Sequence, residues 1–378
     1  MKKVLIAHQS TIPHYRVPFY NALEQHKSDD WCFDVVFDPS ELDKKTFFKE
    51  ELNLNSFKFS ILEVSTISLK IAGTKICYQT FWQKAAAYDL IVIEQALNNL
   101  AYPLCHFHQL QGIKLMYWGH GKHRKIQKPS FFRSLSEQAK LFLTKQANGF
   151  FAYTPGVKSF LIEQGFPANQ IFVLNNTVDI NKQRQAFEKF KEQKEKIKRS
   201  LGIANKKVLL FVGRFGNTKR VDFLLEAFSI LQKNDNSFHL LMLGTGGQEY
   251  LQDKPENITY FGSILDLDKV APIYVAADVF SFPGSVGLGP LQALCYNLPV
   301  VTIDSHIQSP EIEYLSPQNS LILPSNTTPK EYAKSIVELF AKPQRLADLQ
   351  NNAWSTIRHL TIEQMAQNFA QGIDSILN

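Results

Sequence analysis

Three turns in the second half of this 378-residue chain combine glycine with residues that can hold an anion. Each turn follows a short apolar run, VLLFV, FHLLML or VFSFP, which predicts a buried strand. Open α/β sheets bind ligands at the carboxyl ends of their strands, and glycine lets a phosphate approach the backbone. We therefore predict a nucleotide diphosphate site that includes Gly213, Arg214, Lys219, Gly244, Thr245, Gly287 and Leu288.

Arg214 and Lys219 have the chemistry needed to stabilise a departing diphosphate. A preorganised guanidinium and ammonium would lower the energy of the negative charge that develops on the leaving oxygens. The alternative is that both are surface residues at the end of a loop. Their place between a predicted strand and the start of a helix favours the phosphate role.

Alternating strand and helix patterns predict a parallel sheet in each half of the chain, covered by helices on both faces. The predicted strands are 4–8, 33–37, 90–94, 113–118, 150–154 and 171–175, then 208–212, 238–243, 258–261, 279–283, 299–303 and 320–324. Helices are predicted at 14–26, 78–88, 98–111, 130–147, 156–165, 328–341, 343–357 and 361–377.

These elements indicate two domains. We expect a first domain at 1–180 and a second, nucleotide-binding domain at 200–355. The Lys-rich segment 181–199 is expected to be a connection that contains an amphipathic helix. The last helix, 361–378, is expected to pack back on the first domain.

Composition places few limits on function. The net charge of +6 favours anionic partners. No reader motif or stacking platform for nucleic acid is present, so nucleic acid is not an expected partner. The four cysteines form no C-x-x-C pair, and the first apolar run is too short for a signal peptide, so we expect a cytoplasmic protein.

Motifs in both halves resemble glycosyltransferase family 4. In the second half these are the GR-x4-K turn, the LGTG turn, the FPGSVGLGPLQAL segment and PVV. In the first half they are IPHYRVPFYNAL, YWGHGK and GVKSFLIEQGFPANQIFVLNNTVD. The resemblance implies an α/β protein of the GT-B fold, with two facing Rossmann-like domains, mostly parallel sheets and a cleft between them. It also implies a retaining, metal-independent enzyme that uses a nucleotide diphosphate sugar.

Two positions depart from this family. Many members carry two glutamates eight residues apart in the turn before the helix, and here those positions hold Gly284 and Gln292. The amide of Gln292 can still hydrogen-bond a ribose hydroxyl, because it both donates and accepts. The departure removes a carboxylate from the donor sugar and leaves open whether donor choice or activity changes.

Further site residues follow from the resemblance. Arg214 and Lys219 match the positions of a cationic pair in family members. His120 in YWGHGK matches a first-domain histidine that points at the donor sugar in the family. We expect His120 to hydrogen-bond a sugar hydroxyl or to orient the acceptor. Glu311 matches a family position near the donor, although acidic residues are also common at helix starts.

The loop after the first predicted strand adds His14 and Arg16 as candidates on the acceptor or phosphate side. Arg16 is placed either to hold a phosphate or to start a helix with a solvated charge. Asp266-Leu267-Asp268 has the D-x-D pattern that binds metal in other transferases, but it opens a predicted helix, where acidic residues are ordinary. We therefore expect no metal and no other cofactor.

Residues 122–145, which overlap the helix predicted at 130–147, contain seven Lys or Arg and one Glu. The apolar residues Phe131, Phe132, Leu135, Ala139 and Phe142 of this helix share one helical face. Such a surface can dock on anionic lipid at the inner face of the cytoplasmic membrane. The alternative is a helix packed in the core with a solvated basic side.

The leading hypothesis is a hexosyl- or deoxyhexosyl-transferase that acts on a lipid-linked or saccharide hydroxyl acceptor, in the synthesis of a bacterial cell-surface polysaccharide or glycolipid. Two alternatives remain. One is a GT-B nucleotide-sugar epimerase, which would need acid and base carboxylates that we cannot place. The other is a catalytically inactive GT-B partner subunit, which the loss of both glutamates motivates. No motif specifies the donor base, the sugar or the oligomeric state.

Overall fold

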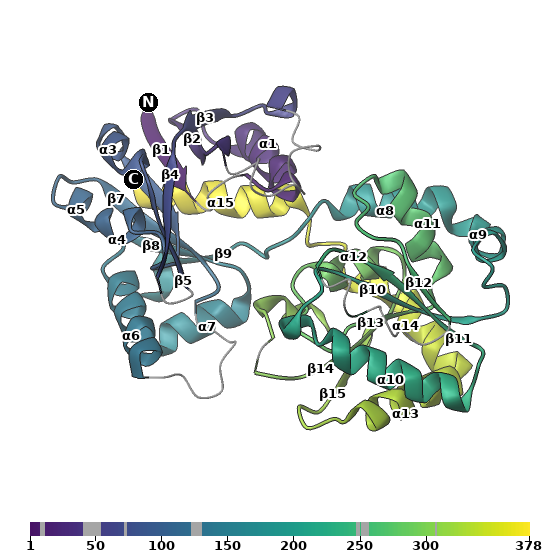
Figure 1. The fold of residues 1–378 in the computed structure, drawn as a ribbon. Coiled ribbons are helices and arrows are strands. Elements are labelled where there is room, and N and C mark those ends of the chain that lie inside the picture. Colours follow the sequence, from purple (N-terminus) through teal and green to yellow (C-terminus); the bar gives the residue numbers. More distant parts are fainter. Residues whose placement is uncertain are drawn as a thin grey trace. The chain divides into compact units, whose positions relative to one another are not determined.

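The computed structural model describes residues 1–7, 12–40, 54–71, 74–121, 131–246, 250, 257–306 and 308–378. The chain forms two compact units (Figure 1). The first contains the described residues up to Val178 together with Ile362–Asn378. The second contains the described residues of Asp179–Thr361.

The first unit is built on a seven-stranded parallel sheet in the order β3-β2-β1-β6-β7-β8-β9. Residues 90–93 of the inner strand β6 are fully buried, as expected for a sheet covered on both faces. The strands are β1 (Lys2–Ala7), β2 (Trp31–Phe37), β3 (Ser60–Glu63), β6 (Leu90–Glu94), β7 (Lys114–Gly119), β8 (Gly149–Ala152) and β9 (Ile171–Val173).

Most helices of the first unit are short. They are η1 (His14–Arg16), α1 (Val17–His26), η2 (Leu54–Ser56), α3 (Phe81–Lys84), η3 (Ala85–Ala87), α4 (Ala101–Leu104), α5 (His106–Gln109), α6 (Phe131–Lys145), α7 (Pro155–Glu163), η4 (Ala168–Gln170) and α15 (Ile362–Leu377). An antiparallel hairpin of β4 (Thr66–Ile71) and β5 (Thr74–Gln79) forms a separate two-stranded sheet. The sequence analysis did not predict this hairpin or β3.

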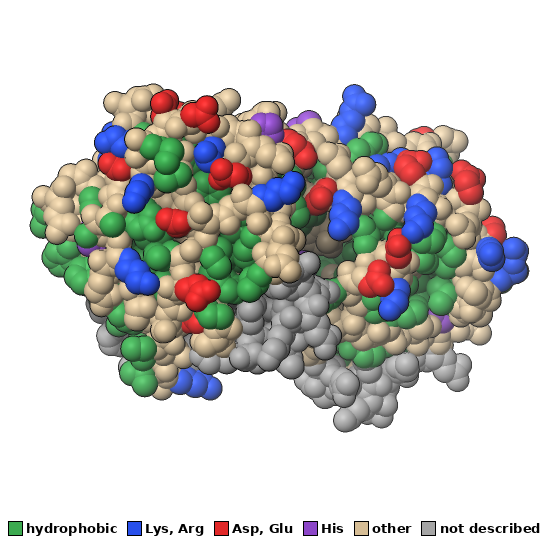
Figure 2. Space-filling model, turned by 90° about the horizontal axis from the view of Figure 1, so that it is seen from above, with side chains coloured by type: hydrophobic (Ala, Val, Ile, Leu, Met, Phe, Trp, Pro, Cys, Tyr) green, Lys and Arg blue, Asp and Glu red, His purple; other side chains and the backbone are tan. Residues whose placement is uncertain are grey.

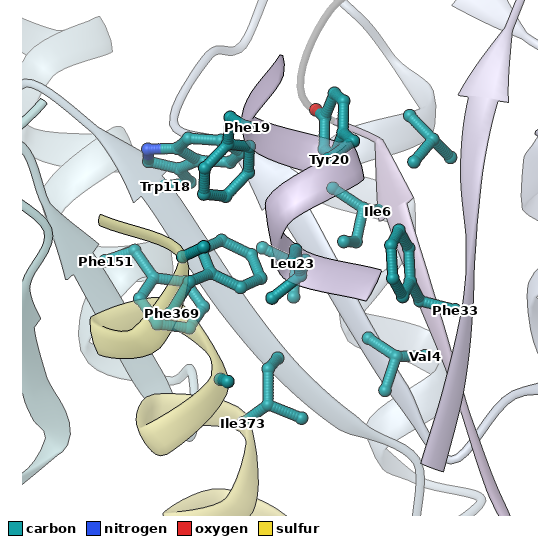
Figure 3. Packing of buried hydrophobic residues seen from close by; sticks show 14 of the residues in the cluster. Val4, Ile6, Phe19, Tyr20, Leu23, Phe33, Trp118, Phe151, Phe369 and Ile373 are labelled. Carbon is teal, nitrogen blue, oxygen red and sulfur yellow. The ribbon is translucent and has the colours of Figure 1, made fainter. Parts of the chain in front are cut away.

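The last helix packs into an aromatic cluster of the first unit (Figure 3). The ring of Phe369 on α15 stacks on Phe151 of β8, with 4.0 Å between centroids. It also meets Trp118 of β7 at 5.1 Å and Phe19 of α1 at 5.4 Å. In Figure 1 the yellow α15 lies beside the purple α1, so the end of the chain completes the core built by its beginning.

The second unit has a six-stranded parallel sheet in the order β12-β11-β10-β13-β14-β15. Its strands are β10 (Lys207–Val212), β11 (Phe238–Leu243), β12 (Ile258–Tyr260), β13 (Val279–Ser281), β14 (Val300–Ile303) and β15 (Ser320–Leu323). The helices are α8 (Ile180–Phe190), η5 (Lys191–Gln193), α9 (Lys194–Ser200), η6 (Asn217–Lys219), α10 (Val221–Asn234), α11 (Leu267–Ala276), α12 (Gly289–Cys295), η8 (Pro310–Tyr314), α13 (Pro329–Phe340) and α14 (Pro343–Ile357).

Residues 181–199, which were expected to connect the domains, lie within the second unit. They form α8, η5 and most of α9, and α11 packs against both α8 and α9. Asp278 explains the attachment of α9, since its carboxylate forms ion pairs with Lys194 at 2.7 Å and Lys198 at 3.1 Å. The alternating Lys and Glu of this segment do not show which lysines form ion pairs with the second unit, so these bonds could not be predicted from the sequence.

Candidate functional site

Two of the predicted turns flank the point where the strand order of the second sheet reverses. Strands β11 and β12 lie on one side of β10, and β13 to β15 lie on the other. The turn after β10 contains Gly213 and Lys219, and the turn after β13 contains Gly284 and Gly287. In open α/β sheets this switch point is where ligands bind.

The glycine turn after β11 packs directly on the turn after β10. A Cβ atom at Gly244 would lie 1.8 Å from the carbonyl oxygen of Gly213, so only glycine fits there. Its φ of 144° is also a conformation that other residues rarely adopt. The carbonyl of Thr245 accepts a hydrogen bond of 2.7 Å from the N–H of Phe215, so Gly244 and Thr245 support the first turn.

The turn after β13 also packs closely against Lys219. A Cβ atom at Gly284 would lie 2.4 Å from the carbonyl carbon of Lys219 and 2.5 Å from its Cα. The N–H of Ser285 donates to the carbonyl of Thr218 at 2.9 Å, which fixes this contact. Position 284 therefore has no room for a side chain in this turn.

The ammonium of Lys219 is directed into the same turn. It donates a hydrogen bond to the carbonyl of Ser285 and lies 5.1 Å from the ring centroid of Phe282. It would be 3.9 Å from a Cβ atom at Gly287, so the cation and the glycine turn are adjacent. An anion beside Gly287 would meet this positive charge.

Two side chains that the sequence analysis missed hold the turn in place. Gln308, only 3% exposed, accepts from the N–H of Val286 at 2.9 Å and donates to the carbonyl of Gly284 at 3.0 Å. The hydroxyl of Ser309 accepts from the N–H of Gly287 at 2.8 Å. The N–H of Gly287 is therefore bonded within the protein, to Ser309.

The remaining second-unit candidates differ in exposure. Arg214 is exposed, and its guanidinium forms no hydrogen bond or ion pair with the part of the chain that the structure describes. Leu288 and Gln292 are half-buried at the start of α12. Glu311 is 3% exposed in η8. Arg214 is thus available to a ligand, whereas Glu311 is part of the packed interior.

In the first unit, His120 is exposed directly after β7. Its ring lies 4.5 Å from the ring of Tyr153, which follows β8. Both residues stand at the carboxyl ends of neighbouring parallel strands, as the sequence analysis expected for His120. Gly121, with φ of 73°, packs against Val157 and Phe160 of α7, which fixes the turn that carries the histidine.

Arg16 is buried, so the structure does not favour its expected phosphate role. It is 1% exposed, and its guanidinium donates to Asn176 Oδ1 at 2.5 Å. It also lies 5.2 Å from the ring of Trp118 and 6.0 Å from that of Tyr153. His14 is partly buried, and burial lowers the pKa of its imidazole, which favours the neutral form. Arg16 therefore contributes to the packing beneath the strand ends.

Asp266 and Asp268 have structural roles. Asp266 Oδ1 accepts from the N–H of Asp268 at 3.0 Å and caps α11, while Asp268 pairs with Lys189 at 2.7 Å. Among the described residues, no group of three or more His, Cys, Asp or Glu is arranged to hold a metal ion.

Helix α6 exposes three of the apolar residues that were predicted to share one face. Leu135 is 54% exposed and Phe142 63% exposed, and Ala139 between them is also exposed. Lys140 and Thr144 lie on the buried side, where Thr144 accepts from Gln95 at 2.9 Å. The alternative of an apolar face packed in the core is therefore wrong for these three residues. Residues 122–130 lie outside the described residues, as do the side chains of Phe131, Phe132 and Arg133.

Charge is mixed on the face seen in Figure 2, where Lys and Arg side chains alternate with Asp and Glu on both units. The net charge of +6 is not gathered into one patch on that face. Within the described ranges, no helix combines the length and the apolar character needed to cross a membrane.

Sequence comparison matches the second unit to a known family. Residues 206–342 match the family described as Glycosyl transferases group 1, and this range contains the Lys219, Gly284 and Gln308 contacts. The chain is similar to an uncharacterized glycosyltransferase of Methanocaldococcus jannaschii, with 23% identity over 353 residues that cover 86% of this chain and 88% of the relative. A protein in the cps region of Klebsiella pneumoniae is 27% identical over 165 residues, which cover 41% of each chain.

Solved structures share the whole fold. HepE of Anabaena, solved in complex with UDP, has a TM-score of 0.70 and 17% identity, covering 99% of this chain and 100% of that chain. A glycosyltransferase from Rickettsia africae has a TM-score of 0.69 and 16% identity, covering 100% and 99%. The fold is therefore of the GT-B class, with mostly parallel sheets in two α/β units, and the family match supports sugar transfer.

Proposed function

We propose that this chain is a retaining glycosyltransferase that moves a hexosyl or deoxyhexosyl group from a nucleotide diphosphate sugar to a hydroxyl acceptor. The observation that carries the proposal is the contact between Lys219 and the Gly284–Gly287 turn at the switch point of the second sheet. This contact lies inside the range that matches the glycosyltransferase family. It supplies a fixed cation where a diphosphate would bind.

UDP is the first donor nucleotide to test. HepE was solved with UDP and with UDP-glucose, and TarM of S. aureus was solved with UDP and α-GlcNAc-glycerol. These complexes support a nucleotide-sugar donor and a saccharide acceptor for this chain. The similarity to a protein in a cps region supports a role in bacterial cell-surface polysaccharide synthesis.

In the proposed reaction, the bond from the anomeric carbon to the β-phosphate oxygen breaks, and that oxygen keeps the electron pair. The acceptor oxygen bonds to the anomeric carbon on the same face, and its proton passes to the departing diphosphate. Lys219 and Arg214 would stabilise the charge on the diphosphate. Gly284 has no side chain that could act as a nucleophile, which favours this front-face route. We assign His120 to the sugar or the acceptor.

We propose that the reaction needs no metal, because Lys219 and Arg214 can neutralise the diphosphate. The Asp266 and Asp268 carboxylates are committed to a helix cap and an ion pair. The epimerase alternative stays without a placed pair of acid and base carboxylates.

We also propose that α6 brings the enzyme to an anionic membrane at the inner face of the cytoplasmic membrane. Exposed Leu135 and Phe142 supply an apolar contact, and residues 122–133 supply Lys and Arg in the sequence. Apolar insertion and attraction to anionic headgroups act together in this kind of attachment. A lipid-linked acceptor would then be within reach.

A nucleotide panel followed by an activity assay tests the function. Purified protein is screened by thermal shift against UDP, GDP, ADP and TDP, and donor turnover is then measured with the matching sugar nucleotides. A nucleotide that stabilises the protein and a donor that is consumed would support the proposal. Stabilisation without turnover, with donor hydrolysis also absent, would favour the inactive partner subunit.

A further inference from the structure

We propose that Gln308 is a positioning residue for Lys219, and that it acts through the carbonyl of Ser285. This inference rests on the proposed function, because it concerns the cation that we assign to the donor diphosphate. Gln308 lies outside every motif that the sequence analysis selected. Both the oxygen and the nitrogen of its carboxamide form hydrogen bonds within the protein.

The carboxamide of Gln308 binds the residues on both sides of Ser285. Its Nε2 donates to the carbonyl of Gly284 at 3.0 Å, and its Oε1 accepts from the N–H of Val286 at 2.9 Å. With one residue held on each side, the orientation of the intervening peptide groups is fixed. These are the groups that present the Ser285 carbonyl.

The same side chain is anchored to the sheet. Nε2 of Gln308 also donates to the carbonyl of Ile303, at the end of β14, at 2.7 Å. The side chain is 3% exposed, so these bonds are shielded from water. A buried polar group with satisfied bonds on several sides is costly to displace, which makes it a rigid support.

Lys219 depends on this support. Its ammonium donates to the Ser285 carbonyl, while the Ser285 N–H donates to Thr218 one residue earlier. Ser285 therefore binds both the backbone and the side chain of the turn after β10. The close contact of Gly284 with the Lys219 backbone leaves this arrangement little freedom. If Gln308 releases the turn, the ammonium loses its fixed acceptor.

The first test measures Lys219 directly and needs no ligand. The rate of acetylation of Lys219 by acetic anhydride is measured by peptide mass spectrometry, relative to the exposed Lys269, whose side chain is 73% accessible. Gln308→Met keeps the length of the side chain and removes its bonds. We expect Lys219 to react about threefold faster or more in this variant, which is the scale of coupling between contacting residues.

Asn319 provides a matched control. It is a buried amide of the same unit that accepts from Ser316 N–H at 2.9 Å and donates to Tyr314 O at 3.0 Å and Thr356 Oγ1 at 2.8 Å. Asn319→Leu should leave the Lys219 rate unchanged. An unchanged rate in Gln308→Met, or an equal rise in Asn319→Leu, would overturn the proposal.

A second variant keeps the test decisive if Gln308→Met does not fold. Gln308→Glu retains an oxygen for the Val286 N–H but loses the donor to Gly284 and Ile303 when ionised. The increase in the Lys219 acetylation rate from pH 6 to pH 8 should be larger in this variant than in wild type. The reason is that protonation of the introduced carboxylate at the lower pH restores one donor. The same pH response in both proteins would contradict the inference.

Binding of UDP and of uridine then tests the link to function. In a double-mutant cycle, Gln308→Met should weaken UDP binding about threefold or more with Lys219 present, and by clearly less in the Lys219→Ala background. Uridine lacks phosphate, so the effect of Gln308→Met on uridine binding should be the same with Lys219 present and in the Lys219→Ala background. Additive losses would overturn the proposal. If wild type does not bind UDP, the donor assignment fails, and the labelling of Lys219 still decides the role of Gln308.

Discussion

The backbone of Lys219 occupies the space in which a side chain at Gly284 would begin. A Cβ atom there would lie 2.4 Å from the Lys219 carbonyl carbon, far inside normal contact. Glycine at position 284 is therefore a steric requirement of this turn. It also allows Lys219 and the turn after β13 to pack together closely.

We predict that Gly284→Ala strongly reduces donor binding and lowers stability by about 1–3 kcal/mol, the usual range for forced overpacking. Because the obstacle is backbone, the turn must move, and the Ser285 carbonyl must move with it. Thermal unfolding and UDP titration measure the two effects.

Gly213→Ala is the matched control for this prediction. A Cβ atom at Gly213 would meet the ring of Phe282 at 3.4 Å, an ordinary contact, so this variant should keep the stability of wild type. Gly284→Glu should not raise activity, since the carboxylate cannot be placed without moving Lys219. Wild-type binding by Gly284→Ala would show that the turn is more plastic than its contacts indicate.

We predict that Lys219→Ala and Arg214→Ala each reduce turnover. Each variant should lose about 2–4 kcal/mol of transition-state stabilisation, as for the loss of one preorganised oxyanion donor. The two variants should differ in stability. Arg214 is exposed, so its loss should leave the melting temperature unchanged, whereas Lys219→Ala also removes the bond to Ser285. Steady-state kinetics and thermal unfolding separate these effects, and wild-type turnover in both variants would exclude a role in the reaction.

Whether a feature could be predicted from the sequence depends on whether its signal is local. Continuous apolar runs such as VLLFV and LIVIE predicted the main parallel strands, because a strand that is buried on both faces of a sheet is apolar at nearly every position. Lys219 was found because a cation and glycines share a local motif. Gln308 was not, because its importance lies in contacts with residues 22 and 24 positions away. No local pattern reports such contacts.

The errors have the same origin. Arg16 looks like a solvated or phosphate-binding charge in HYR, yet Asn176, distant in the sequence, and a set of aromatic rings enclose it. The hairpin of β4 and β5 was missed since its exposed Ile67 and Leu69 do not form a buried run. Tertiary burial, which single-sequence patterns do not reveal, decided both cases.

We predict that the first unit loses stability on acidification because His106 is held neutral. Its Nδ1 donates to Gln109 Oε1 at 2.7 Å, and its Nε2 accepts from the Tyr117 hydroxyl at 2.8 Å in that tautomer. Burial lowers the pKa of His106 below 6.5, and the bond to Gln109 offsets part of this. The unfolded chain therefore binds more protons below pH 6.5, so the free energy of unfolding falls as pH decreases.

Urea denaturation at pH 7.5, 6.5 and 5.5, followed by tryptophan fluorescence, tests this prediction. Trp31, Trp82 and Trp118 belong to the first unit and Trp354 to the second, so the first unit holds three of the four tryptophans. His106→Gln should lessen the dependence on pH, whereas substitution of the exposed His359 in the second unit should not. An identical pH dependence in His106→Gln would assign the acid sensitivity to other groups.

We predict that turnover survives treatment with EDTA. The proposed neutralisation of the diphosphate uses Lys219 and Arg214, and Asp266 and Asp268 are engaged within the protein. Asp268→Asn should therefore retain turnover, although it weakens the ion pair with Lys189. Activity that is lost in EDTA and restored by added magnesium or manganese would require a metal in the mechanism.

Our last prediction concerns the exposed apolar residues of α6. Leu135→Ser combined with Phe142→Ser should reduce co-sedimentation with vesicles of phosphatidylglycerol and phosphatidylcholine, because both side chains are more than half exposed and would insert among the lipids. Each basic residue near an anionic surface contributes on the order of 1 kcal/mol, so binding should also weaken as salt is raised. Val337→Ser, which changes a 41% exposed residue of the second unit, is the control and should bind like wild type. If the double variant sediments as wild type does, or wild type fails to bind at low salt, α6 is not a membrane contact, and its exposed apolar residues would need another partner.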